Sequence, residues 1–435
     1  MNKLLRAPYA AAGLVAHALV RIVPPGDSKF QRALSSRRRI LDRYKQWAAG
    51  NRDPSRPLVW FHAPSVGEGL QAAPVLQLVR SRIPHAQIAY TFYSPSAERF
   101  ARSLGADFAD YLPFDTYADA DAILAALKPT ALVFSKLDVW PALTESAARR
   151  GVKIGVISAT LPESSARRGT LARQFLGDAY ASLHRVGAIG EADARRLREQ
   201  GVQADRVAIT GDTRYDQVWA RAQIPSPPMV ASLRSSRPTL VAGSTWPSDE
   251  AHLFPAWVKI RDKIPDARLI IAPHELTPGH LRGVESWARK NELQLTRIGS
   301  GSADADVVLV DRFGLLGDLY ALADVAFVGG GFQPAGLHSV LEPAPYGAPV
   351  LFGPRHERSL DPRKLIEAGG GAEISGTADL VIRLASWLGS SAARDVAGDA
   401  AKTVVMSERG AAERSFDLVR SLLGPLASAS GGREF

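Results

Sequence analysis

Short runs of apolar and β-branched residues recur along this chain, with helix-like segments between them. The runs form two sets, one at 58–62, 88–93, 131–135, 153–158, 186–190 and 207–210, the other at 239–243, 268–273, 307–311, 325–330 and 349–353. Continuous apolar strands that alternate with helices are typical of parallel sheets covered on both faces. The chain is therefore predicted to be an α/β protein with two doubly wound, Rossmann-like domains.

Residues 221–238 separate the two sets. This segment is rich in Pro and Ser and has no strand pattern, so we interpret its middle as a linker. A chain of 435 residues is also too long for one ordinary hydrophobic core. We predict an N-terminal segment at 1–50, a first domain at 51–222 and a second domain at 237–425. Ligands of doubly wound domains bind beyond the carboxyl ends of the strands, and we expect the two domains to face each other across such a cleft.

The positive charge is concentrated at the N-terminus. Of the net charge of +9, residues 1–50 carry +8. An apolar stretch at 7–16 lies beside these basic residues, but it is shorter than the ~20 apolar residues of a spanning helix. We predict a basic, apolar helix that lies in or on an anionic membrane surface. The alternative is an amphipathic helix that packs on the protein itself.

Composition and motifs exclude several classes of function. The chain has no cysteine, which excludes disulfides and thiolate metal sites. No pair of His residues has metal-ligand spacing with further ligands nearby, so we expect neither a metal nor another cofactor. P-loop and G-x-S-x-G motifs are absent, which disfavours phosphoryl transfer and hydrolysis. Because the basic excess is not spread over a folded face with aromatic residues, nucleic acid is not an expected partner.

The first predicted strand ends in a turn that carries one carboxylate. In "LVWFHAPSVGEG", Glu68 follows the strand and opens a helical segment, between Gly67 and Gly69. A Glu at this position commonly caps a helix or pairs with its dipole. A carboxylate at the carboxyl end of a strand can also act as a general base, because substrate can reach it there.

A glycine-rich stretch at 325–354 is the richest candidate for ligand binding. A buried strand runs into Gly330 and Gly331, and we predict a helix that starts near 336–338. Glycine amides at a helix N-terminus suit a phosphate or carboxylate. His338 lies at this start, and Glu342, one turn further, could accept both hydroxyls of a ribose.

Three other strand ends carry candidate residues. Ser244 and Thr245 precede an acidic helix start, where a plain N-cap is the alternative. Arg214 lies just before the predicted linker and suits a phosphate or carboxylate. Lys136 and Asp138 follow the strand at 131–135, whereas Trp140 is interpreted as packing.

The order of these motifs resembles the 3-deoxy-D-manno-octulosonic acid (Kdo) transferases, membrane-associated glycosyltransferases of the GT-B fold. The resemblance rests on "HAPSVGE", "TFYSPSAER", "YLPFD", "LDVWPAL", "ISATLPESS", "GDTRYD", "GSTWPSDE", "DRFGLLGDLYALADVAFVGGGF" and "GLHSVLEPAPYGAPVLFGP", which follow the family's order. It implies CMP-Kdo as donor, the lipid A precursor as acceptor, and a location at the cytoplasmic face of the inner membrane.

The resemblance also implies roles for individual residues. Glu68 would be the base that takes the proton from the glucosamine 6-hydroxyl as CMP leaves with inversion. Arg214 would stabilise the transition state, and Glu342 would hold the nucleotide. The further substrate-binding positions that it implies are Pro273, His274, Gly314, Leu315, Leu316, Ser339, Val340 and Leu341.

Five positions depart from the family's motifs. Lys136 replaces a carboxylate that is counted among the stabilising residues, and Thr160 replaces an Arg. His274 takes the place of an Arg of the nucleotide site. Leu315 replaces a Glu, and Ser339 replaces an Asn. These changes indicate an altered donor or acceptor preference, or a diverged relative.

Three alternatives to Kdo transfer stay open at this point. The chain could be a GT-B enzyme that uses another nucleotide sugar on a lipid acceptor. It could be a non-catalytic protein of the membrane surface that has kept the fold. Nucleic-acid binding through the basic N-terminus would require salt-sensitive binding that is lost when residues 1–50 are deleted.

Overall fold

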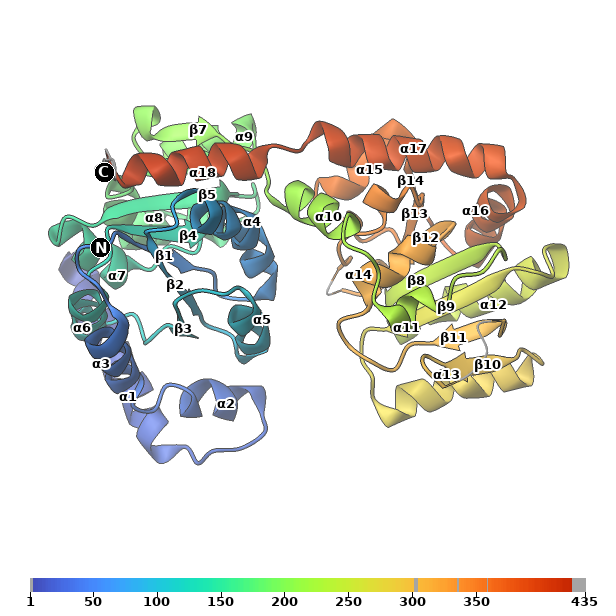
Figure 1. Ribbon diagram of the computed structural model, residues 1–435, viewed down its shortest axis with the longest axis horizontal. Helices are drawn as coiled ribbons and strands as arrows, with labels where there is room; N and C mark the ends of the chain where they lie inside the picture. The colour runs from blue at the N-terminus through green and yellow to red at the C-terminus, as the bar shows by residue number, and fades with distance from the viewer. Residues whose placement is uncertain (1–2, 301–303, 335, 358, 425–435) are drawn as a thin grey trace, which may run out of the picture. The chain divides into compact units, whose positions relative to one another are not determined.

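The computed structural model describes residues 3–300, 304–334, 336–357 and 359–424. The chain divides into two compact units, Met1–Gln217 with Arg409–Phe435 and Val218–Glu408 (Figure 1). Each unit holds one parallel sheet with helices on both faces, which confirms the predicted α/β class and its two Rossmann-like folds.

The first sheet has the strand order β3-β2-β1-β4-β5-β6-β7. Its strands are β1 Leu58–His62, β2 Gln87–Phe92, β3 Phe108–Tyr111, β4 Ala131–Ser135, β5 Lys153–Ala159, β6 Arg185–Ala188 and β7 Val207–Ile209. All neighbours pair in parallel, and β1 is an interior strand, with Val59 opposite Ile88 on one side and Ala131 on the other. Every residue of β1 is buried, as expected for an apolar strand inside a covered sheet.

The second sheet has the order β10-β11-β9-β8-β12-β13-β14. Its strands are β8 Thr239–Thr245, β9 Arg268–Pro273, β10 Leu295–Arg297, β11 Val307–Leu309, β12 Val325–Val328, β13 Val350–Phe352 and β14 Gly371–Glu373. The sequence did not predict β3, β10 and β14. All three are short edge strands with polar residues, so they lack the continuous apolar run by which the other strands are recognised.

Helices cover both sheets. The first unit contains α1 Lys3–Ile22, α2 Lys29–Ser35, α3 Ile40–Asn51, α4 Val66–Arg82, α5 Glu98–Ser103, α6 Tyr117–Leu127, α7 Pro141–Arg149, α8 Thr170–Ala181, α9 Glu191–Glu199, α18 Ala411–Leu422 and the 3₁₀ turns η1 Pro95–Ala97, η2 Ala166–Arg168 and η3 Ala204–Arg206. The second contains α11 Pro228–Ala231, α12 Pro247–Lys263, α13 Pro278–Lys290, α14 Leu316–Leu319, α15 Asp361–Ala368, α16 Thr377–Gly389, α17 Ser391–Ser407, η4 Tyr320–Leu322 and η5 Ala344–Tyr346. Helix α10, Arg214–Ala222, begins in the first unit and ends in the second.

The C-terminal helix packs on the first unit, whereas the sequence placed everything up to residue 425 in the second domain. In Figure 1 the red helix α18 lies against the blue to green elements of the first sheet. Gly155 of β5 leaves room for Leu418 and Leu422, since a Cβ there would lie 2.6 Å from the Leu422 side chain. Asp216 accepts hydrogen bonds from the amides of Gly410 and Ala412 and so fixes the start of α18. These are long-range contacts that no local pattern reports.

The predicted linker at 221–238 is not a free connection. It contains the end of α10 and all of α11, and Val230 and Leu233 are buried in the second unit. The buried guanidinium of Arg268 donates to the Leu233 carbonyl at 2.7 Å. The division between the units therefore falls earlier, at 217/218.

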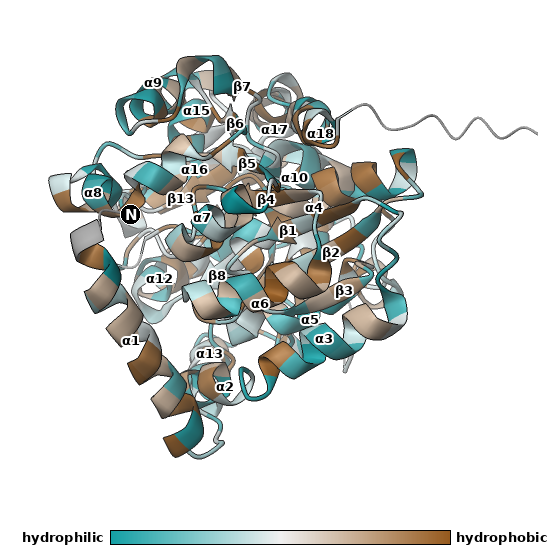
Figure 2. Cartoon of the chain, turned by 90° about the vertical axis from the view of Figure 1, so that its left-hand side faces the viewer, coloured by the Kyte–Doolittle hydropathy of each residue, from teal (hydrophilic) through white to brown (hydrophobic). Residues whose placement is uncertain are grey.

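Helix α1 packs on the first unit along one side and is exposed along the other. Tyr9 donates to Asp115 at 2.5 Å, His17 pairs with Asp119 at 2.7 Å, and both partners belong to the segment that leads into and forms α6. Elsewhere on the helix, Leu14 is 72% and Ile22 75% exposed. Figure 2 shows hydrophobic residues, in brown, along α1. Among the described residues, no helix combines the length and hydropathy that crossing a membrane requires.

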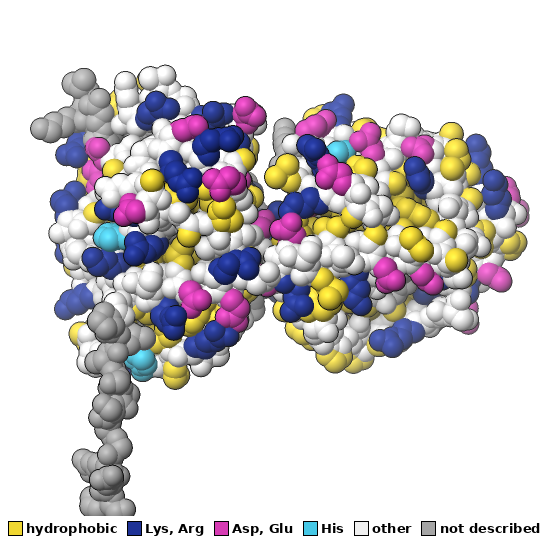
Figure 3. All heavy atoms as spheres, turned by 90° about the horizontal axis from the view of Figure 1, so that it is seen from above, with side chains coloured by type: hydrophobic (Ala, Val, Ile, Leu, Met, Phe, Trp, Pro, Cys, Tyr) yellow, Lys and Arg dark blue, Asp and Glu magenta, His cyan; other side chains and the backbone are white. Residues whose placement is uncertain are grey.

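Charged side chains of both signs are interspersed over each unit on the face shown in Figure 3. That face therefore lacks the continuous basic stripe by which nucleic-acid-binding proteins are recognised.

Candidate functional site

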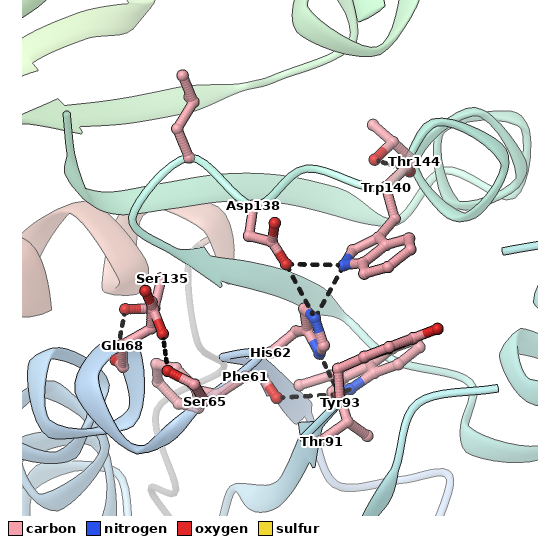
Figure 4. A network of polar contacts seen from close by, with 12 residues as sticks. Phe61, His62, Ser65, Glu68, Thr91, Tyr93, Ser135, Asp138, Trp140 and Thr144 are labelled. Carbon is pink, nitrogen blue, oxygen red and sulfur yellow. Dashed lines mark hydrogen bonds and ion pairs between the residues drawn. The ribbon is translucent and has the colours of Figure 1, made fainter. Parts of the chain in front are cut away.

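Glu68 lies in the first turn of α4, directly beyond the carboxyl end of β1. Its Oε2 accepts a hydrogen bond from the Ser65 hydroxyl, and its backbone carbonyl accepts one from Ser135 at 2.7 Å (Figure 4). Ser65 is the N-cap residue, but its side chain makes no capping bond. The Ser65 hydroxyl thus donates to the Glu68 carboxylate and does not cap the helix. With 21% of its side chain exposed, Glu68 can be reached from solvent.

Lys136 faces Glu68 from the carboxyl end of the neighbouring strand, β4. Its Nζ lies 3.6 Å from Glu68 Oε1. Its backbone is left-handed, with φ at +62°, and its amide donates to the Ile157 carbonyl of β5 at 2.9 Å. Strand order therefore brings together two charged residues that are 68 positions apart in the chain.

Arg214 lies at the start of α10 and is anchored by Asp212. Its Nε and Nη2 both bind Asp212 Oδ2, at 2.8 and 2.7 Å. Asp212 in turn accepts from Gln71 of α4, one turn beyond Glu68, at 3.1 Å. Burial raises the pKa of Asp212, but Arg214 and the hydrogen bonds outweigh burial and hold that pKa below its usual range. The carboxylate therefore stays ionised as the partner of Arg214.

A second polar network lies beside Glu68 at the ends of β1, β2 and β4 (Figure 4). The Trp140 indole donates to His62 Nε2 at 3.0 Å and to Asp138 Oδ2 at 3.1 Å. On the other side of the ring, His62 Nδ1 lies within hydrogen-bond distance of Thr91 Oγ1, at 2.9 Å. Arg167 binds the other oxygen of Asp138 at 3.0 Å.

This network was only partly visible in the sequence. Asp138 was a candidate, whereas Trp140 was assigned to packing and His62 was read only as strand. Trp140 does stack on Tyr93, but its indole N–H also bridges His62 and Asp138. Burial raises the pKa of Asp138, but the contacts with His62 and Arg167 outweigh it, and the pKa is lowered. The sequence signal was that Asp138 and Trp140 follow β4, whereas His62 is itself the last residue of β1.

In the second unit, the glycines after β12 serve backbone packing. Gly330 has φ at +93°, and its amide donates to the buried carboxylate of Asp249 at 2.8 Å. A Cβ on Gly331 would lie 2.5–2.8 Å from backbone atoms of Gly353. The Gly330 amide, predicted to bind an anionic ligand, therefore already has a partner within the protein.

The helix predicted to start at 336–338 does not form. Residues 336–343 are loop and turns, followed by the short 3₁₀ turn η5. Proline at 334, 343 and 345 removes backbone donors, and glycine at 336 and 347 adopts positive φ, so an α-helix cannot propagate here. The prediction of a helix that starts near His338 was wrong, so no helix N-terminus is present there to bind an anion.

His338 belongs instead to a stack of three rings beyond β8, β9 and β12. The His274 ring lies 4.5 Å from both Trp246 and His338. The Trp246 indole donates to His338 Nε2 at 3.2 Å. Burial, followed by the charge of His274, lowers the pKa of His338 to about 4, so its ring is neutral at neutral pH. His274 itself is exposed.

Glu342 lies near Arg221, Asp318 and the buried Tyr320. Burial raises the pKa of Glu342, Arg221 opposes this effect, and Asp318 adds to it. Arg221 and Asp318 form an ion pair at 3.1 Å. Glu342 thus lies in a charged, largely enclosed environment within the second unit.

The remaining candidates of the second unit differ in exposure. Ser244 has φ at +53° at a register shift between β8 and β9, and Thr245 donates to Glu250 at 2.8 Å. The exposed candidates are Gly314 and Ser339, those of intermediate exposure are Leu315 and Leu316, and those with buried side chains are Pro273, Val340 and Leu341. Within the described ranges, no group of three or more His, Cys, Asp or Glu side chains could hold a metal ion.

Gly331→Ala is expected to destabilise the second unit. Its Cβ would overlap backbone atoms of Gly353, which cannot rotate away as a side chain could. Overpacking of this kind costs about 1–3 kcal/mol of unfolding free energy. Gly283→Ala in α13 is the matched control, because no atom lies within 4 Å of its added Cβ and alanine favours the helix. Chemical denaturation that shows equal midpoints for the two variants would contradict the prediction.

Comparisons with known proteins agree with this architecture. Residues 36–217 match the family model described as 3-Deoxy-D-manno-octulosonic-acid transferase (kdotransferase). The 3-deoxy-D-manno-octulosonic acid transferase of Haemophilus influenzae is 26% identical over 396 residues, covering 89% of this chain and 92% of the relative. The protein of the same name from Bordetella pertussis is 29% identical over 392 residues, covering 86% and 90%.

Solved structures show the same fold at low sequence identity. The UDP-GlcNAc 2-epimerase of Neisseria meningitidis has a TM-score of 0.60 at 14% identity, covering 85% of this chain and 99% of its own. A glycosyltransferase of Rickettsia africae has a TM-score of 0.57 at 12% identity, covering 85% and 100%.

The family match covers the unit that carries Glu68, Lys136 and Arg214, and the full-length relatives extend it over the second unit. The chain is therefore similar to 3-deoxy-D-manno-octulosonic acid (Kdo) transferases over most of its length, and it is a glycosyltransferase of the GT-B fold.

Proposed function

We propose that this glycosyltransferase transfers Kdo from CMP-Kdo to the glucosamine 6-hydroxyl of a lipid A precursor, with inversion and without a metal. The observation that carries the proposal is the carboxylate of Glu68, which is fixed by Ser65 and partly exposed, in a chain that is similar to Kdo transferases over most of its length.

The proposed reaction is a single displacement. Glu68 accepts the proton of the acceptor hydroxyl, and the hydroxyl oxygen forms a bond to the anomeric carbon of Kdo. The bond between that carbon and the phosphate oxygen breaks, and CMP leaves with the bonding electrons. Because the attack and the departure take place on opposite faces of the carbon, the configuration inverts.

Charged and polar groups within each unit, taken separately, suit other parts of this reaction. Arg214 is held by Asp212 and provides a fixed positive charge for the anionic transition state. Glu342 is proposed to bind the ribose hydroxyls of the nucleotide. The neutral ring of His338 and the exposed His274 are proposed to contact the donor, with Ser244 and Ser339 as further polar contacts.

The assay that tests the function uses the full chain with CMP-Kdo and lipid A precursor, and the product is weighed by mass spectrometry. Addition of one or more Kdo units supports the proposal. Thermal shifts with CMP, UDP and GDP form a second arm, and stabilisation by UDP alone would favour the GT-B enzyme with another donor. A chain that binds neither nucleotide nor transfers sugar would be the non-catalytic relative.

We further propose that α1 lies on the anionic cytoplasmic surface of the inner membrane, beside the lipid acceptor. The exposed apolar side of the helix, including Leu14 and Ile22, supports this placement. Burying an isoleucine side chain contributes about 1.5–3 kcal/mol, so Ile22→Asp is expected to weaken binding to phosphatidylglycerol vesicles about tenfold or more. Ile382→Asp on α16 is the control, since Ile382 is 67% exposed. Equal vesicle binding of the two variants would contradict the placement.

A further inference from the structure

We propose that Lys136 binds an oxyanion of the substrate, a carboxylate or a phosphate, next to the hydroxyl that Glu68 deprotonates. The inference rests on the proposed function. It assigns a ligand to Lys136, at a position where the motif of the Kdo transferases has a carboxylate.

The backbone of Lys136 is held in a conformation that a side chain makes costly. Its φ of +62° is in the left-handed region, where glycine is the least strained residue. Two hydrogen bonds fix the chain at this turn. The Lys136 amide donates to the Ile157 carbonyl at 2.9 Å, and the Ser135 hydroxyl donates to the Glu68 carbonyl at 2.7 Å. Residues held in strained conformations cluster at ligand sites, because the surrounding structure must determine where their side chains lie.

Among the residues that the structure describes, the Lys136 ammonium makes an ion pair with Glu68 but no hydrogen bond. At 3.6 Å, the separation of Nζ and Oε1 exceeds the 2.7–3.2 Å range of N–H···O hydrogen bonds. The ammonium has three N–H donors. Lys136 is also the outer member of the pair, with 46% of its side chain exposed against 21% for Glu68. A substrate that approaches the carboxylate therefore meets a cation with free donors.

Neighbouring cations are already engaged by the protein. Arg167 binds Asp138 at 3.0 Å and also the Leu137 carbonyl. Arg214 is bound twice by Asp212. The geometry thus favours Lys136 as the cation that a substrate oxyanion would meet beside Glu68.

The chemistry requires a counter-charge at this point. When Glu68 takes a proton it becomes neutral, and the ammonium loses its anionic partner. An octulosonic acid donor carries a carboxylate on its anomeric carbon, and a phosphorylated sugar acceptor carries a phosphate on the reacting ring. Either group would lie within a few ångströms of the reacting oxygen and would pair with Lys136 as the proton moves.

The test compares Lys136→Gln and Lys136→Arg in steady-state assays with CMP-Kdo and lipid A precursor. Loss of one transition-state donor costs about 10²-fold in rate, and we expect Lys136→Gln to reduce kcat/KM by this factor. Lys136→Arg, which keeps the charge, is expected to restore most of it. Lys128→Gln is the matched control, because Lys128 also has a left-handed backbone, with φ at +45°, but lies at the C-terminal end of α6.

Two arms of the assay identify the source of the oxyanion. If the partner is the phosphate, removing it from the acceptor should lower kcat/KM of wild type to that of Lys136→Gln. The same change of acceptor should not lower kcat/KM of the variant further. If the loss in the variant is the same with both acceptors, the partner is the carboxylate of the donor.

Two results would overturn the inference. Lys136→Gln could behave like Lys128→Gln, or it could shift the acid limb of the pH–rate profile while keeping the plateau rate, in which case Lys136 only adjusts the base. A wild-type chain that does not transfer Kdo would instead overturn the proposed function, and this inference with it.

Discussion

Glu68→Gln is expected to reduce kcat by about 10²–10⁴-fold, because the amide cannot accept the proton of the attacking hydroxyl. The substitution keeps the size of the side chain and the hydrogen bond from Ser65. We therefore expect nucleotide binding and the midpoint of thermal unfolding to stay close to those of wild type. Single-turnover assays with CMP-Kdo measure the loss directly.

Glu191→Gln is the matched control for this substitution. Glu191 also lies in the first turn of a helix that follows a strand of the first sheet, but its side chain is 69% exposed and pairs with Arg198 at 3.4 Å. Its activity should equal that of wild type. If Glu68→Gln retained wild-type kcat, another group would have to be the base.

Arg214→Ala is expected to lower kcat by about 10²–10³-fold, since it removes a preorganised positive charge from the transition state. Asp212 holds the guanidinium by two contacts, so little reorganisation is needed when negative charge develops on the leaving phosphate. Arg214→Lys keeps the charge but loses the two-pronged contact, and its rate should lie between those of wild type and Arg214→Ala.

Asp212→Asn distinguishes the positive charge of Arg214 from the positioning of that charge by Asp212. The variant leaves Arg214 in place without its anionic partner, and its kcat should fall less than that of Arg214→Ala. Initial rates at saturating donor and acceptor distinguish the effects on kcat from those on KM. A rise in KM alone in Arg214→Ala would show that the residue binds substrate in the ground state only.

Much of the fold could be predicted because buried parallel strands leave a continuous apolar signal. The runs around β1, β4 and β8 are buried over their full length or nearly so, and each coincides with a predicted strand. The edge strands β3, β10 and β14 were missed, since an edge strand needs only one neighbour and tolerates polar residues. The C-terminal helix was assigned to the wrong unit, because its partners Asp216 and Gly155 are about 200 or more residues away.

In the candidate site, a residue could be predicted only from the residues next to it in the sequence. Glu68, Lys136 and Arg214 each follow a strand, so their general position could be predicted. Their anchors could not be, since Gln71 binds Asp212 across 141 positions and Trp140 binds His62 across 78. In the second unit, the glycines suggested a ligand cradle, but one of their amides is bound by Asp249.

By itself, the sequence determined that two parallel sheets form and which residues follow their strands, because apolar periodicity and strand-end turns are local properties of the chain. The tertiary structure alone decided which of those residues meet. Strand order places Lys136 opposite Glu68, Asp212 beside Gln71, and the Gly330 amide on Asp249. The physical reason is that charges and hydrogen bonds act over a few ångströms in space, whereas the sequence records only separation along the chain.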